Sequence, residues 1–203
     1  MSSARREAFH HGNLAEAAVE AALAMLEDEG NFTLRGVAER LDVAHRAVAA
    51  RFGDRAGLAA AVAARGFDRL GQAIGASRDA ESFLRAYASF ALAHPALYDL
   101  MMRQEYEAFA RDPALRAAAD RIISLALQSF ARGIANPTEA RRAVMRWWML
   151  VHGGIALHRA GVLFGREDSG FIDELLAIGG FGAASAVPGQ PIWNETAGAS
   201  DDQ

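Results

Sequence analysis

The sequence of 203 residues contains no cysteine and no lysine. Without cysteine the chain has no disulfide bond, no zinc–thiolate site and no thiol nucleophile. No apolar run reaches the roughly 20 residues that span a bilayer. The arginines near the N-terminus are not followed by a hydrophobic segment, so we expect neither a secretory signal nor a membrane partner. We therefore expect a cytoplasmic protein.

The sequence also has no stretch in which apolar and polar residues alternate, which is the pattern of a half-buried β-strand. Hydrophobic residues make up 52% of the chain. Many of them are alanine, the residue that most favours helix. The length is sufficient to bury a core. We predict an all-α fold, with an N-terminal three-helix bundle followed by a larger helical domain.

An excess of positive charge is missing as well, because the formal net charge is −4. The molecule as a whole is not the basic body expected of a protein that coats DNA without sequence preference. Any contact with DNA must come from a local basic surface. Such a surface is available between Ala44 and Ala56, where three arginines stand against the single acid Asp54.

The segment from Thr33 to Leu58 has the pattern of a helix-turn-helix. Thr33 is a good N-cap, and Asp42 tolerates the left-handed conformation that a sharp turn needs. Val48 and Phe52 form an apolar pair on a second short helix. The apolar stripe of the first helix consists of Leu34, Val37, Ala38 and Leu41.

The opposite face of the second helix carries small residues and arginines, which suit close approach to base edges and phosphates. The alternative is that Arg46 and Arg51 only solvate an exposed helix. The candidate DNA-binding residues are Thr33, His45, Arg46, Ala49, Arg51 and Arg55.

Helix-start and helix-stop residues divide the rest of the chain. We interpret residues 1–12 either as an arm that contacts DNA or as a disordered terminus, and expect Asn13 to cap the first helix and Gly30 to end it. The later helices are predicted over residues 54–75, 79–93, 95–110, 113–134, 137–161 and 171–178. The predicted domains are 1–53 for DNA binding, 54–181 for regulation and dimerisation, and 182–203 as a disordered tail.

Several separated motifs resemble the TetR/AcrR family of bacterial transcriptional regulators. In the helix-turn-helix they are Leu34, Val37, Ala38, Leu41, Asp42, Val43, Val48, Phe52, Asp54 and Leu58. Trp148, His152 and Gly153 are similar to the Trp-His-Gly signature of one subgroup. The opening run His10–Leu14 and the run His94–Met101 are also typical of that subgroup.

The resemblance implies a homodimer that binds operator DNA and holds a small-molecule pocket in its C-terminal domain. Two copies also agree with the geometry of reading two half-sites. Three positions depart from the family pattern, because Ala44 replaces the usual serine or threonine, Ala49 replaces the usual tyrosine, and Asp42 replaces the usual turn glycine. A binding module that has weakened or lost its DNA binding is therefore the alternative to a DNA-binding repressor.

For the dimer face we predict Val144, Trp148, Val151, Ile155, Leu175 and Ile178. For a pocket that accepts a small apolar effector we predict Tyr87, Phe90, Met102, Tyr106, Phe109, Trp147, Trp148 and His152. Aromatic and methionine side chains line apolar ligand sites. The alternative for both sets is ordinary core packing, and for His152 a structural role.

We expect no enzymatic activity, cofactor or metal. No phosphate-binding glycine loop or nucleophile motif is present. His152 and His158 are six residues apart, which places them on different faces of a helix and argues against a shared metal.

Overall fold

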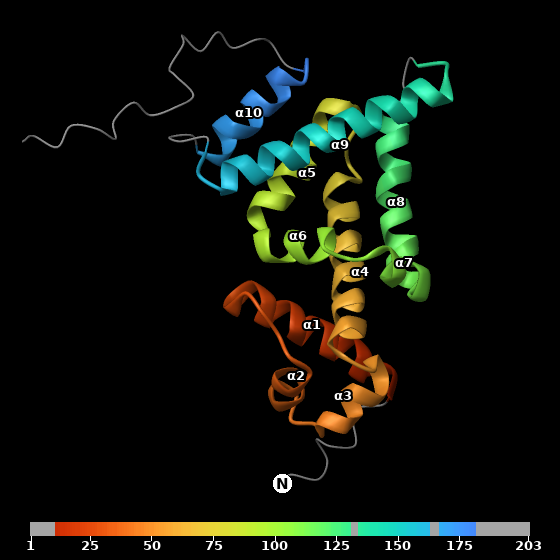
Figure 1. Ribbon diagram of the computed structural model, residues 1–203, viewed down its shortest axis with the longest axis vertical. Helices are drawn as coiled ribbons and strands as arrows, with labels where there is room; N and C mark the ends of the chain where they lie inside the picture. Colours follow the sequence, from red (N-terminus) through yellow and green to blue (C-terminus); the bar gives the residue numbers. More distant parts are fainter. Residues whose placement is uncertain (1–10, 131–133, 163–166, 182–203) are drawn as a thin grey trace, which may run out of the picture. The chain divides into compact units, whose positions relative to one another are not determined.

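The computed structural model describes residues 11–130, 134–162 and 167–181, and every regular element in these ranges is an α-helix, as predicted. The helices are α1 (His11–Glu29), α2 (Leu34–Arg40), α3 (His45–Phe52), α4 (Arg55–Ile74), α5 (Ala80–Ala93), α6 (Pro95–Met102), α7 (Tyr106–Arg111), α8 (Pro113–Phe130), α9 (Pro137–Arg159) and α10 (Asp168–Ile178) (Figure 1). The predicted arm and tail lie outside the described residues, except for the start of α1.

The chain divides into two compact units. Among the described residues, the first unit comprises 11–72 and 94–124, and the second comprises 73–93, 125–130, 134–162 and 167–181. Both α4 and α8 therefore contribute residues to each unit. This division follows packing, and the functional boundary predicted after residue 53 stays a prediction.

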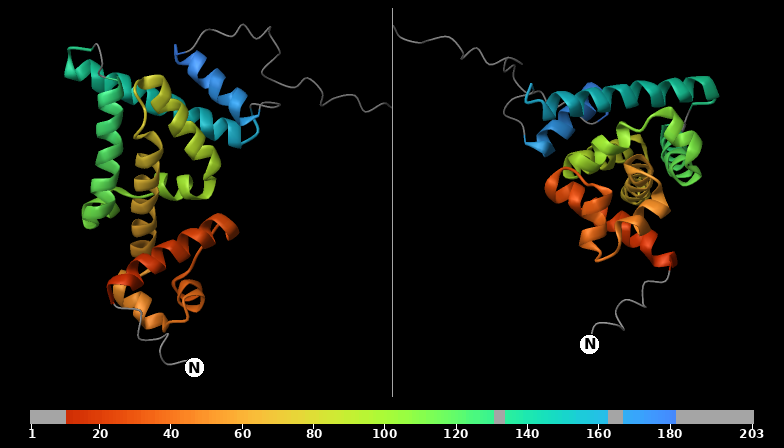
Figure 2. Two further views of the ribbon diagram at one scale, coloured as in Figure 1. Left: turned by 180° about the vertical axis from the view of Figure 1, so that it is seen from behind. Right: turned by 60° about the horizontal axis from the view of Figure 1, so that its bottom comes forward.

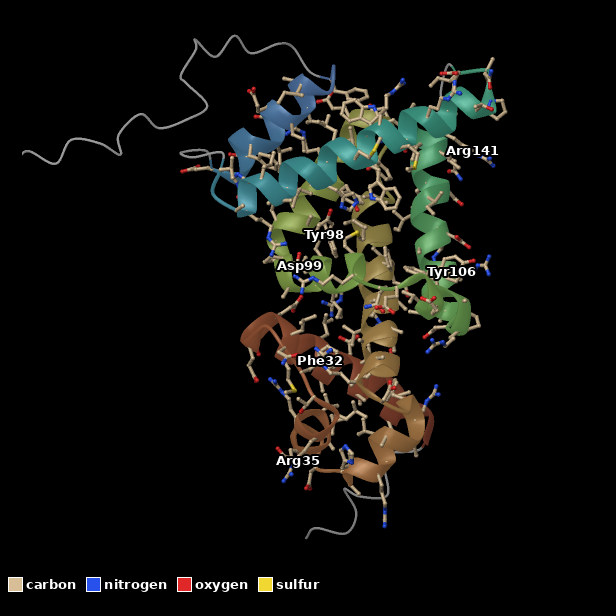
Figure 3. The ribbon with its side chains drawn as sticks, viewed as in Figure 1. Phe32, Arg35, Tyr98, Asp99, Tyr106 and Arg141 are labelled. Atoms are coloured by element: carbon tan, nitrogen blue, oxygen red, sulfur yellow. The ribbon has the colours of Figure 1, made fainter. Side chains whose placement is uncertain are left out.

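In the first unit, α1, α2 and α3 pack against one another. Figures 1 and 2 show these three helices side by side. Of the predicted inner faces of α2 and α3, Leu34, Val37, Ala38 and Val48 are buried. Leu41 and Phe52 are only partly buried. Phe32, just before α2, is 1% exposed. Figure 3 shows Phe32 within this unit and Arg35 at its outer surface.

The helix starts follow from local side-chain chemistry. The Thr33 hydroxyl accepts a hydrogen bond from the Gly36 amide at 2.9 Å, which confirms Thr33 as the N-cap of α2. The Asp54 carboxylate accepts one from the Gly57 amide at 2.9 Å at the start of α4. A Cβ at Gly57 would meet the carbonyl oxygen of Phe52, so the end of α3 lies directly against the first turn of α4.

The turn between α2 and α3 is a Schellman motif built on Asp42. Asp42 has φ +54°, and it is the one non-glycine residue with positive φ in the part of the chain described. The Val43 amide donates to the Ala38 carbonyl at 3.0 Å, and the Asp42 amide donates to the Glu39 carbonyl at 3.2 Å. The left-handed turn predicted at Asp42 is confirmed.

Three element boundaries were predicted incorrectly. The first helix already begins at His11, so Asn13, which was expected to be its N-cap, lies inside α1. The helix expected over 95–110 is two helices, α6 and α7, separated at residues 103–105. The side-chain amide of Gln104 donates to the Leu100 carbonyl at 2.9 Å, so a side chain satisfies the end of α6 without any proline or glycine. The last helix begins at Asp168 rather than at Phe171.

In the second unit, α5, α9 and α10 pack together around a core that includes Phe83, Leu84 and Ala88. Val151, Ile155 and Leu175 are also buried in this core. These three residues were predicted to lie on the dimer face. That prediction is wrong, because their side chains are already buried within the unit. None of the described helices is long and apolar enough to cross a membrane.

Asp42 allows a direct test of the turn. Glycine adopts positive φ without the steric cost that an L side chain bears. We expect Asp42→Gly to raise the free energy of unfolding by roughly 0.5–1 kcal/mol, after allowing for the extra freedom of glycine in the unfolded chain. Asp42→Val should lower the free energy of unfolding by more than about 1 kcal/mol, because the β-branched valine side chain is disfavoured at positive φ. Urea unfolding would measure both, and equal midpoints for the three proteins would contradict the assignment.

Candidate functional site

The helix α3 is anchored on one side and open on the other. Val48 is 0% exposed, whereas His45, Arg46 and Arg51 are exposed and Ala49 is partly exposed. Ala44 occupies the N-cap position with extended backbone and makes no side-chain cap hydrogen bond. The first turn of α3 therefore lacks the stabilisation that serine or threonine would supply there.

Most arginines of α2 and α4 are paired within the protein. Arg35 contacts Glu39, Arg40 contacts Asp28 and Glu29, Arg65 contacts Glu16 and Glu20, and Arg69 contacts Glu20 and Glu27. Within the described residues, Arg46 and Arg51 of α3 have no acidic partner, and the Arg51 guanidinium lies 5.9 Å from the ring centre of its neighbour Phe52. The exposed part of α3 thus carries two arginines whose positive charge no acidic side chain of the described residues compensates.

His45 lines an open hollow together with Arg35, Ala38, Glu39 and Val43. These residues come from α2, the turn and the first residue of α3. Arg35 and Glu39 were not among the predicted site residues, although their spacing of four residues on a helix is the pattern of an ion pair. They place one exposed ion pair beside His45.

Two of the predicted DNA-binding residues have partners inside the protein. The Thr33 hydroxyl caps α2. The Arg55 guanidinium donates to the Asn31 side-chain oxygen at 2.8 Å and to the Phe32 carbonyl at 3.3 Å. For both residues a contact with DNA stays a prediction, and the structure directs Arg55 toward the segment between α1 and α2.

Three of the predicted ligand-binding residues meet in the second unit. The Tyr87 hydroxyl and the His152 Nε2 are 3.2 Å apart. The rings of Tyr87 and Trp148 each pack edge-on against the His152 ring, with centroids 5.9 Å and 5.3 Å away. Tyr87 is buried, while Trp148 is 46% exposed. Burial lowers the pKa of His152 from 6.5 to about 4, so its ring is neutral near pH 7.

Trp147 belongs to a neighbouring aromatic group. Its ring lies 6.1 Å from that of Phe130 and 4.5 Å from that of Phe181, and it packs against Gly179 after α10. Phe130 also contacts Phe83 edge-on at 5.8 Å. Phe83 and Phe130 were missed as members of this group, because only tertiary packing brings α5, α8 and α9 together.

The remaining predicted ligand-binding residues are distributed differently. Phe90 is buried in α5. Met102, Tyr106 and Phe109 belong to the first unit, where the Phe109 ring lies 6.4 Å from that of Phe67. Tyr106, at the start of α7 (Figure 3), is 83% exposed. Tyr106 and Met102 were expected to lie on one face of a single helix. Because the chain breaks at residues 103–105, they belong to two different helices.

His158 is the other histidine of α9. Its Nε2 lies 3.0 Å from the Asp168 carboxylate, and its ring stacks on Phe171 at 4.3 Å. Its Nδ1 is buried and has no hydrogen-bond partner. No group of three or more metal-ligating side chains occurs within the described residues.

Residues 80–178 match the family described as the tetracyclin repressor-like C-terminal domain. The part of the chain from α5 to α10 therefore belongs to this tetracyclin repressor-like family of domains. No curated protein matches the sequence.

Three solved structures illustrate the likeness. A protein of unknown function from Rhodococcus sp. RHA1 is 26% identical with a TM-score of 0.68, covering 85% of this chain and 96% of that one. A possible TetR family transcriptional regulator from Streptomyces coelicolor A3(2) is 20% identical with a TM-score of 0.52, and the match covers 84% of this chain and 76% of that one. A single-residue variant of TetR from Acinetobacter baumannii AYE, in complex with minocycline, is 19% identical with a TM-score of 0.56. That match covers 80% of this chain and 92% of the other.

The family match over residues 80–178 agrees with the arrangement of the described helices. A helix-turn-helix near the N-terminus is followed by a helical C-terminal domain of the type found in ligand-binding regulators. The family assignment therefore confirms the resemblance seen in the sequence. The Trp-His-Gly subgroup stays a prediction.

His152 predicts a loss of stability at acid pH. Because burial lowers its pKa, the unfolded chain binds a proton between about pH 6.5 and pH 4 while the folded chain does not. The His152 contribution to the free energy of unfolding therefore falls as the pH drops through this window. We expect His152→Gln to flatten this part of the profile in urea unfolding at a series of pH values. His45→Gln, at an exposed histidine, is the control, and an identical slope in all three proteins would contradict the expectation.

Proposed function

We propose that this protein is a homodimeric transcriptional repressor of the TetR family, whose affinity for operator DNA is lowered by a small apolar effector. The observation that carries the proposal is the exposed face of α3, where Arg46 and Arg51 have no acidic partner within the described residues. Arginine recognises guanine edges and phosphates through its planar donor groups. Because the protein has a net charge of −4, contact with DNA requires a local basic surface, and this face of α3 supplies one.

The exposed apolar side chains of α9 and α10 support a homodimer. Met145, Trp148 and Met149 share one face of α9 at a spacing of three and four residues, and Ile178 is exposed on α10. On the same α9 face, a Cβ built at Gly153 meets nothing within 4 Å, so a partner helix could approach closely there. Trp148 and Ile178 were predicted for this face, and Met145 and Met149 extend it.

The aromatic side chains of the second unit support an apolar effector. Tyr87 and His152 offer one polar contact among rings, and His152 is uncharged near neutral pH. A neutral, largely apolar molecule matches this chemistry better than an ion does. We propose that such an effector favours a dimer whose recognition helices are wrongly spaced for DNA, so that operator affinity falls by a population shift.

The alternative function is a helix-turn-helix module with weak or absent DNA binding. The uncapped start of α3 at Ala44 favours it, because this turn lacks a side-chain hydrogen bond. A gel-shift titration with the DNA upstream of the protein's own gene separates the two functions. A specific shift supports the repressor, and no shift with any genomic fragment at moderate salt supports the alternative.

Arg46 and Arg51 should affect DNA binding in different ways. If Arg46 reads a base, Arg46→Ala should relax sequence preference at one position and cost about 1–3 kcal/mol of binding free energy. If Arg51 contacts a phosphate, Arg51→Ala should weaken binding to all sequences and reduce the salt slope by about 1. Gel-shift titrations at several salt concentrations measure both effects.

A control for these two variants is Arg116→Ala. Arg116 is an exposed arginine of α8 paired with Asp120, and its removal should leave DNA binding unchanged. Binding that is indifferent to Arg46→Ala would contradict the role in base reading.

Met149 tests the dimer face. It is 63% exposed in the single chain, and a carboxylate there would have to be desolvated when two copies associate. We expect the wild-type protein to be a dimer in sedimentation analysis and Met149→Glu to weaken the association about 100-fold. Ile123→Glu, at an exposed apolar residue of α8, is the matched control and should stay dimeric. A monomeric wild-type protein at micromolar concentration would refute the proposed assembly.

A further inference from the structure

Arg55 is the first residue of α4, yet its side chain returns to a segment 23 and 24 residues earlier in the chain. Its Nη2 donates to the Asn31 Oδ1 at 2.8 Å, and its Nε donates to the Phe32 carbonyl oxygen at 3.3 Å. Its Cζ atom also lies 5.2 Å from the centre of the Phe32 ring. Three contacts thus direct one guanidinium toward two adjacent residues.

The segment that Arg55 contacts is the one that starts α2. Phe32 is buried, and the next residue, Thr33, caps α2 through the Gly36 amide. Asn31 and Phe32 therefore connect the core of the first unit to the N-terminus of α2. Holding them in place also holds the position at which α2 begins.

The first turn of α4 contacts the other end of the helix-turn-helix as well. Gly57 lies directly against the Phe52 carbonyl at the end of α3. The start of α2 and the end of α3 are consequently both tied to the beginning of α4, while the Schellman turn at Asp42 joins the two helices in between. The result is a closed set of contacts around the helix-turn-helix.

We propose that Arg55 is a positioning residue, which fixes the start of α2 relative to α4 and so holds α3 in the orientation that presents Arg46 and Arg51. This inference rests on the proposed DNA-binding function, and it assigns Arg55 a role inside the protein instead of the contact with DNA expected from the sequence. The guanidinium suits the role because its planar group donates in two directions at once, which a lysine ammonium on a flexible stem does not reproduce.

Arg55→Lys separates the two roles because it keeps the positive charge and removes the two directed donors. A positioning residue predicts that Arg55→Lys lowers operator affinity about three- to tenfold at every salt concentration, with an unchanged salt slope. A phosphate contact predicts affinity close to that of the wild type, and this result would overturn the proposal. The probe is a duplex that the wild-type protein selects from genomic fragments, and titrations are made well below the unfolding temperature, so that all variants are folded.

Asn31 provides the second variant. Asn31→Ala leaves every arginine in place and removes the acceptor of the 2.8 Å hydrogen bond. It should lower operator affinity in the wild-type background and have little further effect in the Arg55→Lys background, because the two residues act through one contact. Additive losses would contradict the proposal.

Arg65→Lys is the matched control. Arg65 also lies on α4 and pairs with Glu16 and Glu20 of α1. A role limited to stability would lower the unfolding temperature of Arg55→Lys without changing the operator affinity of the folded protein. An affinity loss in Arg65→Lys equal to that in Arg55→Lys would likewise overturn a specific role for Arg55.

Hydrogen exchange at the Gly36 amide tests the positioning role without DNA. This amide is bonded to the Thr33 hydroxyl, so its exchange reports the first turn of α2. We expect faster exchange in Arg55→Lys and no change in Arg65→Lys, and an unchanged rate in Arg55→Lys would refute the positioning role. If the wild-type protein binds no DNA, the proposed function fails while this measurement still decides the role of Arg55.

Discussion

The burial of Val48 is the constraint on which the proposed DNA-binding face depends. Val48 has no exposed surface, and α3 is only eight residues long. Exposing a buried valine costs about 1.5–3 kcal/mol, which opposes rotation of so short a helix about its axis. Because Arg46 is two residues away, it lies on the opposite side of the helix. Burial of Val48 therefore explains why Arg46 faces outward.

Charge pairing gives this exposed face its electrostatic character. The ion pairs of Arg35, Arg40, Arg65 and Arg69 are at least partly exposed, and such pairs add little to stability. Their effect on the electric field is larger, because they cancel positive charge over α1, α2 and α4. Arg46 and Arg51 of α3 therefore keep a local positive charge in a protein whose net charge is −4.

Two adjacent glycines illustrate how α9 separates an inner face from an outer one. A Cβ at Gly154 would meet Leu175 Cδ1 at 2.8 Å, so α10 packs closely against this position. A Cβ at Gly153 would have nothing within 4 Å. Val151 and Ile155 lie on the buried side, whereas Met145 and Met149 are exposed. The glycine at position 154 serves the core of the unit, and that at position 153 leaves space on the face proposed for the dimer.

The sequence alone determined the features that depend on neighbouring residues. The caps at Thr33 and Asp54, the turn at Asp42 and most helix bounds follow from interactions over two to five residues, which are visible in a pattern. The break at Gln104 escaped prediction because an ordinary polar side chain competes with the backbone there. The contact of Arg55 with Asn31 and that of His152 with Tyr87 are set by the packing of distant helices and segments. Those contacts join residues 24 and 65 positions apart, and no local periodicity encodes which distant surfaces will be buried together.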